Sequence, residues 1–185
     1  MFSGIVQKVC PARKSGSKLA VDLGELSSDL LPGASVAVDG VCLTVVSVEG
    51  SVALFDLAAE TLKLTTLGSF ERVNIERALK IGDEVGGHFV SGHVMGVGEI
   101  LSRIGERLTL AFPASLRPYL FLKGYVTVDG ISLTIAALNE EELTVCLIPE
   151  TCARTTLGLK SEGDKVNLEV DSLTQAAVDT ILRIR

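Results

Sequence analysis

The sequence lacks long hydrophobic runs, although 47% of its 185 residues are hydrophobic. A membrane-spanning helix needs about twenty mostly apolar residues in a row, and the chain has no such run, so we expect no membrane partner. The apolar residues fall instead in short bursts of Val, Leu and Ile, which is typical of half-buried strands. The first residues also lack the basic region and long apolar core of a signal peptide, so we expect a cytoplasmic protein.

Clustered basic residues are also missing. The chain has 17 Lys and Arg against 23 Asp and Glu, which gives a net charge of −6 at pH 7. Binding to the phosphate backbone of nucleic acids depends on clustered Lys and Arg side chains. We therefore expect no nucleic-acid partner.

Metal-binding motifs are scarce. The sequence contains four cysteines: Cys10, Cys42, Cys146 and Cys152. None forms a CxxC pair, so neither a zinc knuckle nor a thioredoxin-like site is indicated, and we expect reduced, mostly buried thiols. The two histidines, His88 and His93, would lie on opposite faces of an extended strand, which makes them a poor metal pair. We expect no metal site.

The sequence does contain an internal repeat. Residues 38–45 recur 90 positions later as residues 128–135, with five of the eight residues identical. Three further matches keep the same order along the chain: 60–68 with 150–158, 3–6 with 91–94, and 73–76 with 166–169. Four ordered matches at nearly constant spacing indicate a tandem duplication.

Each half of the repeat contains about six short strand-like segments. In the first half we expect strands at residues 2–9, 18–23, 35–39, 42–48, 51–57 and 72–77. Turn signals such as Asp39-Gly40 separate them, and these turns are expected to be mainly structural. Many short strands with close turns favour an all-β sandwich or closed barrel, and a closed barrel leaves no exposed edge. One short helix is expected in each half, at 60–67 and 150–157.

The final residues, 172–185, have a helical pattern. Ser172 can cap a helix. Apolar positions recur at helical spacing over Leu173, Ala176, Ala177, Thr180, Ile181 and Ile184. A helix this short is marginal alone, so the stripe should pack on the chain's own barrels or on copies of itself, and the spacing leaves both open.

Polar residues stand at matching strand positions in the two halves. Period-two geometry places Cys42 and Thr44 on one face of a strand, and Ser132 and Thr134 on the equivalent face of the other half. An Asp-Gly turn precedes each pair, which places the first residue at a barrel rim, where small ligands bind. An isolated Thr reflects only β-propensity, but the matched positions favour two similar pockets. The Glu-Thr pair at each short helix offers backbone N–H groups to a polar ligand.

These motifs together resemble the riboflavin synthase family. They are the opening Met-Phe-Ser-Gly-Ile-Val, the duplicated Asp-Gly-x-[Cys/Ser]-Leu-Thr, Gly-Gly-His-x-x-Ser-Gly-His at 86–93, Ile-Pro-Glu-Thr at 148–151 and Asn-Leu-Glu-Val-Asp at 167–171. The resemblance runs from Met1 to the C-terminal helix. It implies two tandem six-stranded Greek-key closed β-barrels, residues 1–87 and 88–171, followed by a trimerisation helix, 172–185.

The resemblance also implies an activity. In the family's reaction two molecules of 6,7-dimethyl-8-ribityllumazine dismutate by transfer of a four-carbon unit. The products are riboflavin and 5-amino-6-ribitylaminopyrimidinedione, and the reaction is the last step of riboflavin biosynthesis. The implied protein is a homotrimer that needs neither a metal nor another cofactor, and lumazine synthase is a further implied partner.

Carried onto this chain, the resemblance implies two substrate pockets. The first would comprise Gly4, Ile5, Val6, Cys42, Leu43, Thr44, Asp56, Leu57, Ala58, Ala59, Glu60 and Thr61. The second would comprise Gly92, His93, Val94, Lys123, Ser132, Leu133, Thr134, Cys146, Leu147, Ile148, Pro149, Glu150 and Thr151. Two identical substrates must meet in a fixed orientation, so we expect the N-terminal barrel of one chain to face the C-terminal barrel of its neighbour.

Four residues are candidates for the chemical steps. The 7-methyl group of the lumazine is acidic because its carbanion is conjugated with the ring. A base therefore starts the reaction, and a nucleophile or hydroxide adds to C7 of the partner molecule. Cys42 is a candidate for this addition or for stabilising the adduct, and the requirement is thiolate character. Ser132, His93 and Asp171 are candidates for proton transfer.

One alternative function belongs to another class. A non-catalytic lumazine- or flavin-binding protein, such as an optical antenna protein, can have the same duplicated fold, and fold alone does not give function. Such proteins tend to lose the polar pair in one or both repeats. Here Cys42, Thr44, Ser132 and Thr134 are all present, which favours the enzyme.

Overall fold

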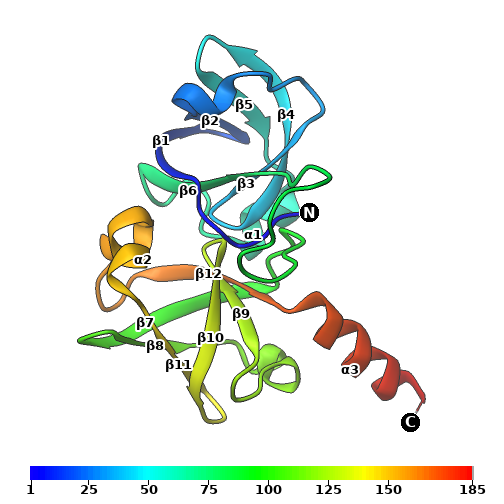
Figure 1. The fold of residues 1–185 in the computed structure, drawn as a ribbon, viewed down its shortest axis with the longest axis vertical. Coiled ribbons are helices and arrows are strands. Elements are labelled where there is room, and N and C mark those ends of the chain that lie inside the picture. Colours follow the sequence, from blue (N-terminus) through cyan, green and yellow to red (C-terminus); the bar gives the residue numbers. More distant parts are fainter. Residues whose placement is uncertain (185) are drawn as a thin grey trace.

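Two closed six-stranded antiparallel β-barrels follow one another along the chain (Figure 1), in a computed structural model that describes residues 1–184. The N-terminal barrel consists of β1 (Lys8–Ser15), β2 (Lys18–Asp22), β3 (Ser35–Val38), β4 (Val41–Glu49), β5 (Val52–Asp56) and β6 (Arg72–Arg77). The C-terminal barrel consists of β7 (Gly96–Ile104), β8 (Arg107–Ala111), β9 (Tyr125–Val128), β10 (Ile131–Leu138), β11 (Glu142–Cys146) and β12 (Lys165–Val170). The predicted all-β, duplicated architecture is confirmed.

Strand order is the same in both barrels. Around the first it is β1-β2-β5-β4-β3-β6, and around the second, starting at β7, it is β7-β8-β11-β10-β9-β12. The hairpin-linked strands β3, β4 and β5 are followed by β6, which returns to pair with β3, and this is the Greek-key connection. Both barrels carry a bulge at the same place, between Val45 and Ser47 and between Ile135 and Ala137, where the strand bends to close the barrel.

An apolar core fills each barrel. In β4 the side chains of Val41, Leu43 and Val45 are buried, while those between them face outward. In β10 the buried positions alternate in the same way. The alternation that predicted the strands is therefore the alternation between barrel core and outer wall.

The expected strand at residues 2–9 is wrong. β1 begins only at Lys8, because Gly4 has a positive φ of 75° and the preceding residues pair outside the barrel. Phe2 forms a bridge with Val90. The other five expected strands of the first half agree with the structure to within one or two residues.

Short helices lie close to where they were expected. They are α1 (Ala59–Leu64) and α2 (Pro149–Arg154), the latter followed by the 3-10 turn η3 (Thr156–Gly158). Two further 3-10 helices, η1 (Gly24–Ser27) and η2 (Ala114–Tyr119), were not predicted. Their four- and six-residue lengths are too short to show a helical period.

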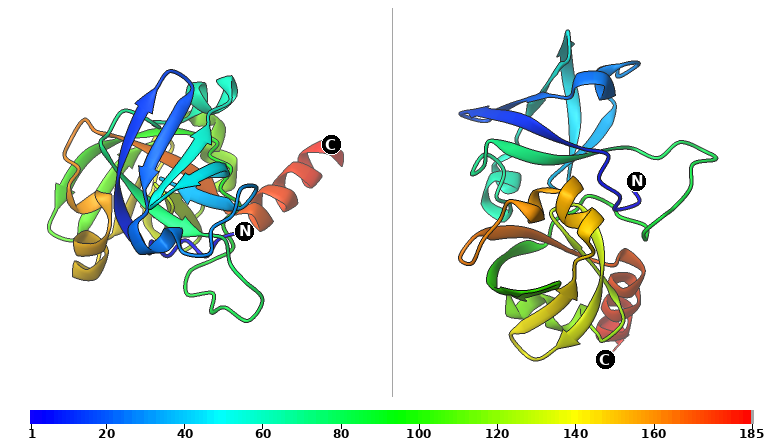
Figure 2. Two further views of the ribbon diagram at one scale, coloured as in Figure 1. Left: turned by 90° about the horizontal axis from the view of Figure 1, so that it is seen from above. Right: turned by 60° about the vertical axis from the view of Figure 1, so that its left-hand side comes forward.

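A pseudo-twofold set of buried hydrogen bonds joins the barrels, which lie one above the other in Figure 1 and in the right-hand view of Figure 2. The Asn74 side chain donates to the Asp129 carbonyl, and the Asn167 side chain donates to the Asp39 carbonyl, each at 2.9 Å. The two Asp-Gly turns touch: a Cβ added to Gly40 would lie 2.6 Å from the backbone nitrogen of the opposite turn. These turns are structural, as expected, and they also form the interface between the halves.

The C-terminal helix α3 (Ser172–Ile184) runs outward from the second barrel (Figures 1 and 2). Asp171, rather than Ser172, caps it, because its carboxylate accepts hydrogen bonds from the backbone N–H and the hydroxyl of Thr174 at 2.9 and 2.7 Å. Tyr119 donates to Asp179 from the barrel side. No helix within residues 1–184 is long and apolar enough to span a membrane.

Candidate active site

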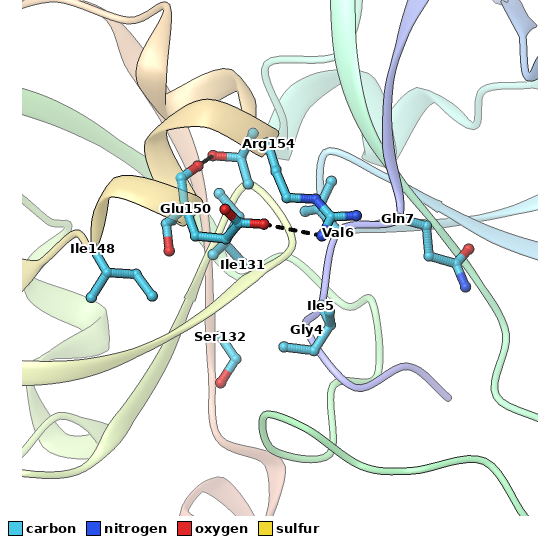
Figure 3. A pocket seen from close by; sticks show the side chains of 11 residues that line it. Gly4, Ile5, Val6, Gln7, Ile131, Ser132, Ile148, Glu150 and Arg154 are labelled. Atoms are coloured by element: carbon cyan, nitrogen blue, oxygen red, sulfur yellow. Dashed lines mark hydrogen bonds and ion pairs between the residues drawn. The ribbon is translucent and has the colours of Figure 1, made fainter.

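A pocket of about 430 Å³ lies on the outer wall of the C-terminal barrel, and we call it the C-barrel pocket (Figure 3). Its lining comes from the N-terminal segment, the start of β10 and the surroundings of α2: Gly4, Ile5, Val6, Gln7, Ile131, Ser132, Ile148, Glu150, Thr151, Arg154 and Thr155. Arg154 extends toward Val6 and pairs with Glu150 at 3.1 Å (Figure 3). The pocket therefore combines an apolar wall with a guanidinium and hydroxyl groups.

A smaller pocket of about 230 Å³ occupies the equivalent place on the N-terminal barrel, and we call it the N-barrel pocket. It is lined by Val41, Cys42, Glu60, Thr61, Leu64, Thr65, Gly92, His93 and Val94. Leu64 stands where the other pocket has Arg154, and Cys42 stands where it has Ser132. The two pockets share no lining residue.

Two of the lining segments lie in the opposite pocket from the one that the sequence analysis assigned to them. Residues 4–6 belong to the C-barrel pocket and residues 92–94 to the N-barrel pocket, so each barrel receives one wall from the other half. Backbone hydrogen bonds fix the exchange: Ser132 N–H donates to Gly4 O, and Cys42 N–H donates to Gly92 O, both at 2.8 Å. The grouping failed because it assigned every motif to the half in which it lies in sequence.

Buried carboxylates anchor the exchanged segments. Glu76 accepts the N–H groups of Ser3 and Gly4 at 2.6 and 3.0 Å, and Glu169 binds Ser91 and Gly92 in the same way. Burial raises the pKa of Glu76, and the Ser3 and Gly4 hydrogen bonds oppose that rise. A Cβ on Gly4 would lie 2.6 Å from the Ser132 Cβ, and φ is +75° there, so only glycine allows this approach.

Several predicted site residues line neither pocket. The leucines in the set, Leu43, Leu57, Leu133 and Leu147, are buried in the barrel cores, so only their backbones can reach a ligand. The others outside both linings are Thr44, Asp56, Ala58, Ala59, Lys123, Thr134, Cys146, Pro149 and Asp171. Thr44 and Thr134 do face outward with Cys42 and Ser132, as the period-two pattern predicts.

The expectation of mostly buried cysteines is wrong. Only Cys10 is buried, and burial raises the pKa of its thiol. The other three lie on outward positions of strands or on α2, and Cys42 is half-buried where it lines its pocket. All four thiols are free. Within residues 1–184 no three His, Cys, Asp or Glu side chains gather as a metal site would require.

His88 is a residue whose place the sequence did not reveal. Its Nδ1 lies 2.7 Å from Ser132 Oγ and its Nε2 lies 3.2 Å from Thr127 Oγ1, while its ring stacks on Tyr125 at 5.0 Å. Burial lowers its pKa, and the Asp171 carboxylate acts in the opposite direction. The one signal in the sequence was the preceding Gly87, because a glycine allows a close backbone approach. A Cβ at this position would lie 2.3 Å from Ser3 O. His93, in contrast, is exposed at the N-barrel pocket.

Comparison with known proteins defines the class first. The lumazine binding domain model matches twice, over residues 3–78 and 91–171, so this is a protein with two lumazine binding domains. Solved structures support the fold: LumP complexed with riboflavin superposes with a TM-score of 0.83 and LumP complexed with 6,7-dimethyl-8-(1'-D-ribityl) lumazine with 0.78, each at 23% identity over 92% of this chain and 99% of LumP.

Full-length relatives then define the family. Riboflavin synthase of Chlamydia pneumoniae is 46% identical over 193 residues, which cover 100% of this chain and 96% of that protein. Riboflavin synthase of Escherichia coli strain K12 is 40% identical over 198 residues, covering 100% and 93%. The chain belongs to the riboflavin synthase family.

Proposed function

We propose that the protein is a riboflavin synthase that converts two molecules of 6,7-dimethyl-8-ribityllumazine into riboflavin and 5-amino-6-ribitylaminopyrimidinedione. One observation carries this proposal: each barrel carries a pocket, and each pocket has a thiol or hydroxyl, Cys42 or Ser132, at the same strand position. A dismutation needs two binding sites for one kind of substrate, and a duplicated pocket supplies them.

The active site is proposed to form between chains of a homotrimer. The two pockets of one chain are lined by different residues, and we propose that the C-barrel pocket of one chain faces the N-barrel pocket of a neighbouring copy. The exposed stripe of α3 supports this assembly, because Leu173, Ile181 and Ile184 are 71%, 55% and 80% exposed in the single chain. An apolar stripe of this kind gains stability by packing on a partner helix.

The positions of the candidate residues support the roles that we propose for them. Cys42, half-buried in the N-barrel pocket, is proposed to stabilise addition at C7 of one lumazine. His93 lines the same pocket, while Ser132 lines the other and is proposed to take the proton from the 7-methyl group of the second lumazine. Asp171 lines neither pocket and caps α3, so its proposed part in proton transfer runs through its charge near His88.

Other partners and the compartment belong to the same proposal. Lumazine synthase is proposed as a partner because the enzyme that makes the lumazine supplies this substrate. The cytoplasm is the proposed compartment, and the four free thiols fit its reducing conditions.

A turnover assay tests the function. Purified full-length protein is incubated with 6,7-dimethyl-8-ribityllumazine alone, and substrate and riboflavin are separated by chromatography. We expect two lumazine molecules consumed for each riboflavin formed. Tight binding of the lumazine without any riboflavin would instead support the non-catalytic, LumP-like function.

A further inference from the structure

The environment of Ser132 differs from that of Cys42 through one buried histidine. His88 is only 7% exposed. It lies in the segment between β6 and β7 and covers the β9–β10 hairpin, where Thr127 and Ser132 are cross-strand partners. Its two ring nitrogens reach the hydroxyls of this pair, at 3.2 and 2.7 Å respectively. The imidazole thus bridges a strand pair at the edge of the C-barrel pocket.

Three sequence differences between the halves build this arrangement. In the N-terminal barrel, Ala37 and Cys42 form the cross-strand pair that corresponds to Thr127 and Ser132. Ser35 stands where the C-terminal barrel has Tyr125, the ring on which His88 stacks with an interplanar angle of 11°. Phe2 instead packs against Ala37 and Cys42. The first half therefore has an apolar contact at the place where the second half holds an imidazole.

One tautomer of the ring, with its proton on Nε2, satisfies both contacts. The 3.2 Å separation from Thr127 Oγ1 suits an N–H donor on Nε2, and the 2.7 Å separation suits a hydroxyl of Ser132 that donates to the Nδ1 lone pair. The charged or titratable groups that face the ring are Asp171, which favours the imidazolium, and the Tyr125 phenol against which it stacks. Burial favours the neutral ring, so its Nδ1 remains free to accept a proton.

We propose that His88 is a positioning residue that accepts the proton of Ser132 and thereby makes Ser132 Oγ the base of the C-barrel pocket. The inference rests on the proposed function. When Ser132 Oγ takes a proton from the 7-methyl group, its own proton passes to Nδ1 of His88, which leaves a lumazine carbanion and an imidazolium beside the Asp171 carboxylate. The proton returns by the same route when the carbanion is consumed. His88 acts through Ser132 and does not itself line the pocket.

The test uses steady-state kinetics of the full-length protein with the lumazine substrate. For His88→Gln we expect kcat to fall by about a hundredfold and KM to change by less than about threefold. The fall of activity at acidic pH, where the neutral ring of the wild type becomes protonated, should disappear in this variant. A residue with a merely structural role would not remove that limb of the pH profile.

Threonine variants provide the matched control. Thr127→Val removes the acceptor for Nε2–H and should lower kcat by about tenfold, whereas Thr127→Ser restores the hydroxyl and should restore most of the rate. Thr144→Val also removes a buried hydroxyl from this barrel, the partner of Thr109 at 3.2 Å, and should leave kcat unchanged.

An unchanged kcat and pH profile in His88→Gln, with an active wild type, would overturn the inference and leave the proposed function intact. An inactive wild type would overturn the proposed function itself. If circular dichroism shows that His88→Gln does not fold, the two Thr127 variants provide the test. Equal kcat values for Thr127→Val and Thr127→Ser would then overturn the role of His88.

Discussion

Asp39 and Asp129 occupy equivalent turns but have different surroundings. Each accepts a backbone N–H at 2.7 Å, from Asn74 and Asn167 respectively. Only Asp129 has a cation, the buried Lys160 ammonium at 2.5 Å. Burial and the charge of Asp129 raise the pKa of Asp39 well above its usual range, whereas Lys160 opposes the rise of the Asp129 pKa.

This asymmetry predicts opposite effects of two matched substitutions. A raised folded-state pKa means that the stability contributed by Asp39 is present at low pH and is lost as pH rises through that pKa. Asp39→Asn should therefore flatten the pH dependence of unfolding and gain stability relative to wild type at alkaline pH. Asp129→Asn leaves Lys160 uncompensated and should cost about 3–5 kcal/mol. Denaturant unfolding across a pH series measures both, and an equal loss in the two variants would contradict the account.

The two pocket residues give a second prediction at this scale. Cys42→Ser and Ser132→Ala should each lower the dismutation rate while leaving lumazine affinity within about tenfold, because binding rests mainly on backbone and threonine contacts. Turnover and equilibrium fluorescence titration separate the two effects. Wild-type turnover in both variants would remove these side chains from the mechanism.

At the scale of elements, the sequence predicted the strands and their faces, because these depend on the local alternation of apolar and polar residues. Strand β6 was expected at the residues it occupies, and Cys42 and Thr44 were placed on one face because side chains alternate along a strand. The path of the N-terminal segment was missed, because its hydrogen bonds are made to Glu76 and to the other half of the chain. The His88 contact was missed for the same reason: the loop that carries it reaches β9 and β10 only in the folded chain.

The exchanged segments make a prediction about fragments. We propose that residues 1–87 and 88–171 are separate folding units, since each barrel has its own core. A fragment of residues 1–88 lacks the 92–94 wall of the N-barrel pocket, while a fragment of residues 1–95 keeps it together with the hydrogen bond from Cys42 N to Gly92 O. The longer fragment should bind lumazine at least about tenfold more tightly. Equal lumazine affinity of the two fragments would contradict the exchanged wall of the pocket. Fragments that are unfolded, as judged by circular dichroism, would contradict the separate folding unit.

At the scale of the whole molecule, the apolar stripe of α3 has no partner within residues 1–184 of the single chain and is exposed. Leu173, Ile181 and Ile184 form this stripe along the outward side, although Tyr119 and Asp179 hold the helix to the barrel. Deleting residues 172–185 should therefore give monomers that still bind ligand in each barrel but lose nearly all turnover, because the second substrate is no longer held nearby. Sedimentation with a turnover assay tests this, and a truncated chain that remains trimeric and active would show that the helix has another role.

The central claim is that a working site combines the N-barrel pocket of one chain with the C-barrel pocket of its neighbour. Two variants can block one pocket each: Thr61→Trp in the N-barrel pocket and Thr151→Trp in the C-barrel pocket. Each variant alone should be inactive. Co-expression in equal amounts should restore roughly a quarter of wild-type turnover, since about one junction in four of a closed ring then joins two open pockets. A mixture as inactive as its components, despite mixed trimers shown by mass spectrometry, would place the complete site within one chain and contradict the account.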